Sequence, residues 1–143
     1  MDQIYKHPKR KTKVVFVQLG SPSEPTTKAL RKYLRKFLGD PRVVDINPWL
    51  WKIILNFFVL PFRPKKSAKL YARIWDGKSF PLITNTRDFT NNVREELKKI
   101  DPNGHVEVNH AFLLSPPYVN EVYDSWEDDL KKGIGATKLL VIP

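Results

Sequence analysis

Three histidines, at positions 7, 105 and 110, are the residues of this chain best suited to acid–base or metal chemistry. His7 lies in a basic stretch, where we expect it to be solvated. His105 and His110 are five positions apart in one predicted strand, so their side chains should face opposite sides of the sheet and cannot hold one metal ion together. The chain has no cysteine, which excludes a thiolate metal site, a disulfide and a cysteine nucleophile. The pattern favours structural or surface roles for these histidines.

A second group with potential chemistry is an acidic run in a predicted helix, where Glu121, Asp124 and Asp128 recur at helical spacing. A cation site is one interpretation, and a solvated helix face is the favoured one. The loop "GSPSEP" after the first predicted strand has neither the three glycines of a dinucleotide-binding fingerprint nor the lysine and serine of a P-loop. It forms either a wall of a ligand cleft or a plain turn.

The most unusual segment is Trp49–Phe62, in which eleven of fourteen residues are apolar. On a helix this apolar arc is too wide for one-sided packing. Two interpretations stay open, a fully buried helix and a lip that meets a membrane surface or a flat apolar ligand. The segment is shorter than the roughly 20 residues of a membrane-spanning helix. Interfacial anchoring would be aided by the cations that follow at once, Arg63, Lys65, Lys66 and Lys69.

Charge is unevenly distributed along the 143 residues, whose formal net charge is +10. Residues 1–75 carry 17 Lys and Arg against four Asp and Glu, whereas residues 76–143 carry eight against eleven. Anionic partners are therefore the first class to consider. We predict no nucleic-acid partner, because no helix-turn-helix, RNP-type strand or zinc finger is visible. The polar opening lacks a secretory signal, so we expect a cytoplasmic protein, peripheral to the inner membrane if the apolar segment anchors it.

Predicted strands alternate with predicted helices, which indicates an α/β fold with a parallel sheet flanked by helices. We expect Thr26 or Thr27 and Thr86 to cap helices, Pro61 to end one helix and Pro64 to begin the next. Because functional loops follow the carboxyl ends of parallel strands, a chain that stops directly after its last strand is expected to be a cut chain. The expected strands are 13–19, 41–46, 105–112 and 137–142, and the expected helices are 28–38, 49–60, 64–75, 88–100 and 118–132.

Three motifs give the chain a resemblance to the amino-terminal half of the ferrochelatase family: "VVFVQLGSPSEPT", "LRKYLRKFLGDPRVVDI" and "FRPKKSAKLYARIWDGKSFPL". Their order and approximate spacing match the family over residues 13–82, and weaker similarity continues to the end. The resemblance implies a two-lobed chelatase with Rossmann-like lobes. Residues 1–12 would be a basic tail and residues 13–143 the amino-terminal lobe, with the second lobe absent. The complete enzyme would insert ferrous iron into protoporphyrin IX, the last step of haem synthesis.

The resemblance also implies which residues bind porphyrin. The serine of the family's "GSPL" motif aligns with Phe80, or with Ser79 if the loop slips by one position. A porphyrin is a flat apolar disc with two propionates, so it needs apolar walls and a few cations at the rim, which Trp49–Phe62 and Arg63 would supply. The implied porphyrin-binding residues are Leu19, Gly20, Ser21, Pro22, Arg63, Tyr71 and Ser79.

The chain departs from the family pattern in three places. Gln18 replaces an asparagine, "KSFPL" replaces "GSPL", and the strand that ends Arg-Tyr in the family reads Phe112-Leu113-Leu114-Ser115-Pro116 here. The family's metal-handling histidine and glutamate belong to its carboxyl-terminal half. We therefore expect no catalytic residue, no metal site and no bound cofactor in this chain, and no iron insertion by it alone.

The expected partners are protoporphyrin or haem, a membrane surface at Trp49–Phe62, and the missing lobe. A non-catalytic porphyrin- or haem-binding module is the alternative function. A half-length chelatase that dimerises is disfavoured, because the short cobaltochelatases carry a histidine where this chain has Leu19.

Overall fold

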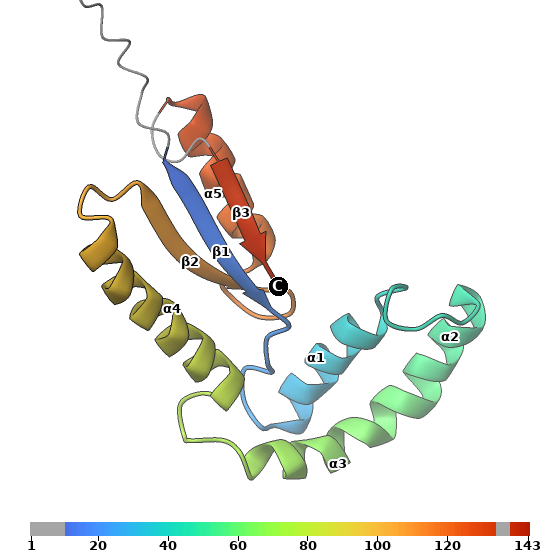
Figure 1. Cartoon of the computed structure of the whole chain (residues 1–143). Coiled ribbons are helices and arrows are strands. Elements are labelled where there is room, and N and C mark those ends of the chain that lie inside the picture. Colours follow the sequence, from blue (N-terminus) through green and yellow to red (C-terminus); the bar gives the residue numbers. More distant parts are fainter. Residues whose placement is uncertain (1–10, 134–137) are drawn as a thin grey trace, which may run out of the picture. The chain divides into compact units, whose positions relative to one another are not determined.

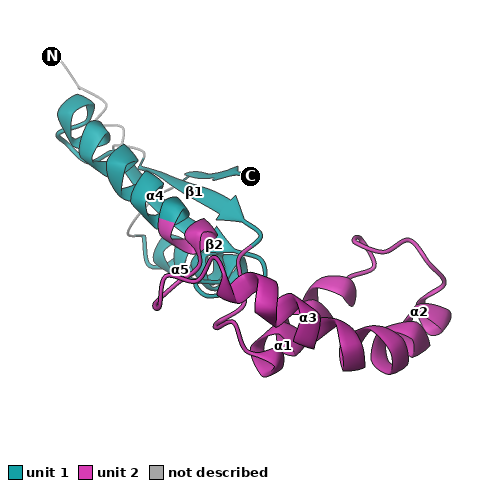
Figure 2. Ribbon diagram, turned by 90° about the horizontal axis from the view of Figure 1, so that it is seen from below, with its two compact units in different colours: residues 1–19, 85–143 teal, residues 20–84 magenta. Residues whose placement is uncertain are grey.

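The computed structural model describes residues 11–133 and 138–143, which form two compact units. Residues 1–19 and 85–143 belong to a sheet unit, and residues 20–84 to a helical unit (Figure 2). His7, Thr137 and most of the predicted basic tail lie outside the described residues.

The sheet unit is built on three parallel strands in the order β2-β1-β3 (Figure 1). Strand β1 (Thr12–Gln18) pairs with β2 (Val106–Phe112) on one side and with β3 (Lys138–Ile142) on the other. The continuous β-branched run of β1 favours extended backbone and suits a central strand. Helices α4 (Pro81–Ile100) and α5 (Val119–Lys131) flank the sheet. The predicted α/β fold with a parallel, helix-flanked sheet is confirmed.

An arginine of α4 covers the outer edge of β2. Arg94 Nε donates to the Val108 carbonyl at 2.7 Å, and its Nη2 donates to Asn109 Oδ1 at 3.0 Å. The other terminal nitrogen of Arg94 donates to Asn91 Oδ1 at 2.9 Å, within α4 itself. Free backbone acceptors on an edge strand invite pairing with another chain, so this cover protects the edge.

The helical unit consists of α1 (Thr27–Leu38), α2 (Pro48–Ile54), the π-helix η1 (Leu55–Val59) and α3 (Leu60–Ala72). Thr26 is the N-cap of α1, where its side chain accepts from the Ala29 N–H at 3.2 Å, as predicted. The buried stripe of α1 and that of α3 form the core of this unit, and their members are Leu30, Tyr33, Leu34, Leu60, Pro64 and Ala68.

The predicted break between Pro61 and Pro64 is wrong, because α2, η1 and α3 follow one another without interruption. Pro61 is the second residue of α3. Because η1 leads into α3 without interruption, the missing N–H of Pro61 also removes a helical donor at the end of η1. Pro64 lies inside α3, and its missing N–H leaves the Leu60 carbonyl without the usual donor four residues on. Arg31 supplies a donor instead, with its Nε 3.2 Å from the Leu60 oxygen.

The predicted strand at 41–46 is also wrong, because residues 41–43 form a turn and no strand follows. The Asp40 carboxylate accepts from the Arg42 N–H at 2.9 Å, which is the local bonding by which aspartate favours turns. The helix expected from 88 begins at Pro81, so Thr86 lies inside α4, where it is buried, and is not the N-cap.

Candidate functional site

Leu19 directly follows β1 at the carboxyl end of the strands in the sheet unit. Its carbonyl accepts from the Leu114 N–H at 3.0 Å, and the Gln18 carbonyl accepts from the Leu113 N–H at 3.0 Å. These two bonds continue the pairing of β1 and β2 past the ends of both strands. The apolar pair Leu113-Leu114, where the family pattern has polar residues, therefore lies beside Gln18 and Leu19.

The turn that follows opens the helical unit at Gly20, whose φ of 91° favours glycine. Ser21 and Pro22 are buried. The Tyr33 hydroxyl of α1 donates to the Gly20 carbonyl at 3.4 Å. Burial raises the pKa of Tyr33 to about 12, and electrostatic repulsion from Tyr71 adds to the shift. Of the predicted residues, Gly20 therefore bonds to the Tyr33 hydroxyl, and Tyr71 contributes to raising its pKa.

The ring of Tyr71 belongs to a cluster of three aromatic rings. Its ring centroid lies 5.5 Å from that of Phe80 in an edge-to-face arrangement, and Phe80 lies 4.7 Å from Trp75. Phe80 is only 2% exposed. It is therefore a core residue, whereas the neighbouring Ser79 is half-buried.

Arg63 lies apart from this cluster, on an exposed part of α3. Eight residues separate it from Tyr71 along the helix, which corresponds to about 12 Å of helix axis. The structure therefore places Gly20 and Tyr71 around Tyr33 and Ser79 next to Phe80, but it does not bring Arg63 to them.

Trp49–Phe62, which we call the apolar lip, is exposed over much of its length. Trp49 is 78% exposed and Phe62 is 72% exposed, and Phe57 and Phe58 are similarly open. Leu55 and Leu60 are the buried residues of the segment. The interpretation of this segment as a fully buried helix is therefore wrong.

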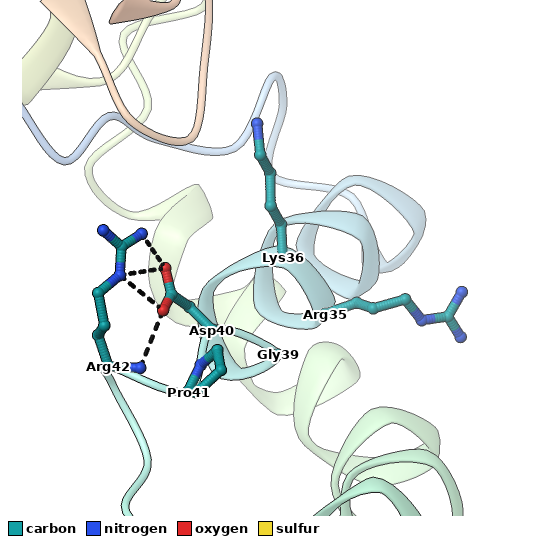
Figure 3. A pocket seen from close by; sticks show the side chains of 6 residues that line it. All are labelled: Arg35, Lys36, Gly39, Asp40, Pro41 and Arg42. Atoms are coloured by element: carbon teal, nitrogen blue, oxygen red, sulfur yellow. Dashed lines mark hydrogen bonds and ion pairs between the residues drawn. The ribbon is translucent and has the colours of Figure 1, made fainter. Parts of the chain in front are cut away.

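A shallow, open hollow of about 680 Å³ lies at the end of α1, where the "LGDPR" motif is located (Figure 3). Asp40 and Arg42 pair within it at 2.6 Å. Hydrogen bonds from Arg42 lower the pKa of the Asp40 carboxyl to about 2. Arg35 and Lys36 point away in different directions (Figure 3), so the cations do not converge on a common point. This motif builds a turn and does not form an anion site.

A second hollow, of about 370 Å³, lies in the sheet unit and is lined by Lys13, Arg94, Glu107, Asn109 and Glu121 among others. Lys13 is 7% exposed, and its Nζ is 3.6 Å from Glu107 Oε1. Glu121 accepts from the Tyr118 N–H at 2.8 Å, so one member of the acidic run caps α5. Within residues 11–133 and 138–143, no three side chains of the metal-ligating types gather around a common point.

The two described histidines occupy different structures. His105 precedes β2, and its Nδ1 is 2.8 Å from Asp101 Oδ1. His110 lies in β2 against Phe112, at a ring-centroid distance of 5.6 Å. Burial, followed by the charge of Arg94, lowers the pKa of His110. The predicted strand starts one residue too early, because β2 begins at Val106. His105 directly precedes it, and its carbonyl accepts from the Thr12 N–H of β1 at 2.7 Å.

The sequence model of one family, ferrochelatase, matches residues 11–143. The chain belongs to the ferrochelatase family. Ferrochelatase of Idiomarina loihiensis is 38% identical over 130 residues, which cover 91% of this chain and 34% of that protein. Ferrochelatase of Teredinibacter turnerae is 42% identical over 135 residues, or 93% of this chain and 35% of the relative. Ferrochelatase of Psychrobacter cryohalolentis is 61% identical over 66 residues, or 46% of this chain and 20% of the relative.

The chain thus spans about a third of the length of the ferrochelatases that it matches along most of its own length. Its place in the family connects it with haem and porphyrin biosynthesis. No helix among its described residues combines the length and the apolar character needed to cross a membrane.

Sequence reasoning missed Tyr33, the residue that joins Gly20 to Tyr71. The helical pattern contained the signal, because position 33 shares a face with Leu30, Leu34 and Phe37 at spacings of three and four. A tyrosine on the apolar face of a helix usually needs a partner for its hydroxyl. That requirement pointed to a nearby backbone acceptor.

Proposed function

We propose that this chain forms the porphyrin-binding wall of a ferrochelatase that, as a complete protein, inserts ferrous iron into protoporphyrin IX. The observation that carries the proposal is the buried Tyr33 hydroxyl, which donates to the Gly20 carbonyl and whose pKa is raised by burial and by Tyr71. Because that hydroxyl is held between α1 and the turn, the wall is formed before any ligand arrives. Such pre-formed walls are typical of sites for flat apolar ligands.

The implied residues have separate tasks in this proposal. The exposed rings of the apolar lip offer a surface to the apolar face of the macrocycle. Arg63 follows the lip directly, and its exposed guanidinium would hold a propionate through charge-assisted hydrogen bonds. Ser21, Pro22 and Ser79, which belong to the same unit as the lip, would complete the wall. Delivery of iron is assigned to the part of the family that this chain does not match.

The test is an absorbance titration of the purified chain with protoporphyrin IX, followed by addition of ferrous iron or zinc. We expect a Soret shift without metal insertion. Measurable insertion would show that this chain has catalytic residues that the proposal denies, and absence of any Soret shift would contradict the wall.

Arg63→Ala should weaken binding by about 1.5–3 kcal/mol, the usual cost of losing a hydrogen bond to a charged group. Arg73→Ala is the matched control, since Arg73 is another exposed cation of the same helical segment, at the C-cap of α3. An unchanged midpoint for Arg63→Ala would remove this residue from the site. Equal losses for both variants would show that the titration measures only general charge attraction.

Complementation distinguishes the ferrochelatase wall from the alternative function, a non-catalytic porphyrin- or haem-binding module. The carboxyl-terminal two thirds of the Idiomarina loihiensis relative would be mixed with this chain and assayed for metal insertion. Insertion that requires both parts supports the ferrochelatase wall, and binding without insertion supports the module.

We also propose that the apolar lip makes peripheral contact with a membrane surface. The exposed aromatic side chains are followed by four cations within seven residues, which suits an anionic interface. Co-sedimentation with vesicles containing anionic lipid should be lost in the Trp49→Ser/Phe62→Ser variant. It should persist in Ile100→Ser, which removes an equally exposed apolar residue from the end of α4. Equal sedimentation of all three proteins would overturn this contact.

A further inference from the structure

We infer that Arg31 is a positioning residue that holds the apolar lip in shape through the Leu60 carbonyl. The inference rests on the proposed function in one respect, since it assigns the lip to porphyrin binding. Its structural basis is independent of any ligand and comes from the backbone hydrogen bonds of η1 and α3.

Two irregularities meet at Leu60. The Leu60 N–H donates to the Leu55 carbonyl, five residues back, which closes the π-helix η1. The Leu60 carbonyl would normally accept from the N–H of residue 64, but that residue is a proline. Leu60 is only 2% exposed, so water has little access to it. Buried carbonyls of this kind are nearly always paired in native proteins.

Arg31 provides the pairing from α1. Its Nε donates to the Leu60 oxygen at 3.2 Å, across 29 residues of sequence. Because the donor is charged, this bond is stronger than a neutral one of the same geometry. The proline that weakens α3 and the arginine that repairs it therefore act as a pair.

A second link holds the other end of the lip. Trp51 Nε1 donates to the Leu38 carbonyl at 2.7 Å, which is one of the carbonyls that the end of α1 leaves free. The two links attach α1 to the lip near its start and near its end. Figure 1 shows α1 running beside α3. With both ends held, Phe57, Phe58 and Phe62 remain exposed.

A π-turn next to a proline is a point at which a helix bends readily. Without the link from Arg31, the segment before Leu60 would pivot at η1. The exposed rings and Arg63 would then lose their common orientation toward a flat ligand. Arg31 affects porphyrin binding in this way without touching the porphyrin.

The test compares two replacements of Arg31. They differ in whether the atom in the place of Nε can donate a hydrogen bond. In Arg31→Gln the amide nitrogen occupies the place of the arginine Nε and keeps an N–H donor without the charge. In Arg31→Met the terminal methyl group occupies that place and cannot donate. Lys32→Met is the charge control, because Lys32 is the exposed neighbour on α1.

Each variant is measured by hydrogen exchange of peptides covering residues 49–62 and by titration with protoporphyrin IX. We expect Arg31→Met to accelerate exchange in this segment and to weaken porphyrin binding by about two- to tenfold, the range of one hydrogen bond. Arg31→Gln should lie between wild type and Arg31→Met, because it keeps the N–H but loses the charge, and Lys32→Met should stay close to wild type. Exchange in β2 should not change in any variant, since β2 belongs to the other unit.

Pro64→Ala makes the test specific, because it restores the N–H that can donate to the Leu60 carbonyl. In that background Arg31→Met should accelerate exchange and weaken porphyrin binding less than it does in the wild type. Such non-additivity is expected when two donors share one acceptor. If Arg31→Met changed exchange and affinity as much in the Pro64→Ala background as in the wild type, the inference would be overturned. So would equal effects of Arg31→Gln and Arg31→Met, or unchanged exchange in residues 49–62.

The two proposals fail in different ways. If the wild-type chain does not bind protoporphyrin IX, the proposed function is wrong, while the exchange data still decide whether Arg31 holds the lip. If porphyrin binds and Arg31→Met changes exchange but not affinity, the lip is held by Arg31 but does not contact the ligand, and the positioning role is overturned.

Discussion

Phe80 provides the sharpest test of the packing around the candidate site. It is 2% exposed and lies between the rings of Tyr71 and Trp75, at 5.5 Å and 4.7 Å. Replacing a buried phenylalanine by alanine costs about 3–5 kcal/mol, because the transfer free energy is lost and a cavity remains. Each ring pair accounts for roughly 0.5–1.5 kcal/mol beyond the buried area. With a urea m-value of about 2 kcal/mol per molar, the unfolding midpoint should fall by roughly 2 M.

The assay is urea denaturation of the wild type and Phe80→Ala. Unfolding is monitored by far-UV circular dichroism and by tryptophan fluorescence. Phe80→Leu keeps most of the volume and should cost less than about 1.5 kcal/mol. Phe58→Ala, which removes an exposed ring of the lip, should stay within about 0.5 kcal/mol of wild type. A similar small cost for Phe80→Ala would refute the packing argument. Phe80→Ser, which introduces the residue of the aligned family motif, should be at least as destabilising as Phe80→Ala, and a neutral effect would show that position 80 faces a ligand and not the core.

Three predictions concern pH. Burial raises the pKa of Tyr33 to about 12 from its usual 10. The contribution of Tyr33 to the free energy of unfolding should therefore be constant below pH 10 and fall between pH 10 and 12, where the unfolded chain ionises first. Urea titrations should show a larger fall over this range in wild type than in Tyr33→Phe. Arg42 lowers the pKa of Asp40 to about 2, so the contribution of this pair is present above about pH 4 and is lost as the pH falls through 2; a carbon NMR titration of the carboxyl should show that Arg42→Gln raises this pKa. Burial and Arg94 lower the pKa of His110. The contribution of His110 to stability is therefore present above pH 6.5 and is lost as the pH falls through the lowered pKa. Proton NMR of the imidazole should show that Arg94→Gln raises this pKa.

The sheet was predictable because its strands carry their own signal. The apolar run of β1 is continuous and mostly β-branched, whereas β2 carries only Val106 and Val108, separated by Glu107. Both segments are bounded by turn residues, so pattern and propensity agree. At 41–46 the same type of signal misled, since "RVVDI" has strand propensity but Asp40 draws Arg42 into a turn. Strand propensity needs a neighbouring strand to act on, and local sequence does not report one.

The path of the lip was not predictable from Pro61 and Pro64, because the group that compensates for Pro64 comes from another helix. Arg31 lies 29 residues away and appears in sequence as an ordinary cation on the polar face of α1. Likewise, the spacing of α1 placed Tyr33 on the buried face but could not show that its hydroxyl reaches Gly20. Side chains that bond to backbone carbonyls leave no fixed pattern in a sequence, and these were the residues missed.

The guanidinium of Arg94 hinders the pairing of a further strand with β2. Its bond to the Val108 carbonyl occupies an acceptor in the middle of the β2 margin, so a foreign strand arriving there would first have to displace a charged donor. Extension of this sheet beside β2 therefore carries the cost of breaking a charge-assisted hydrogen bond.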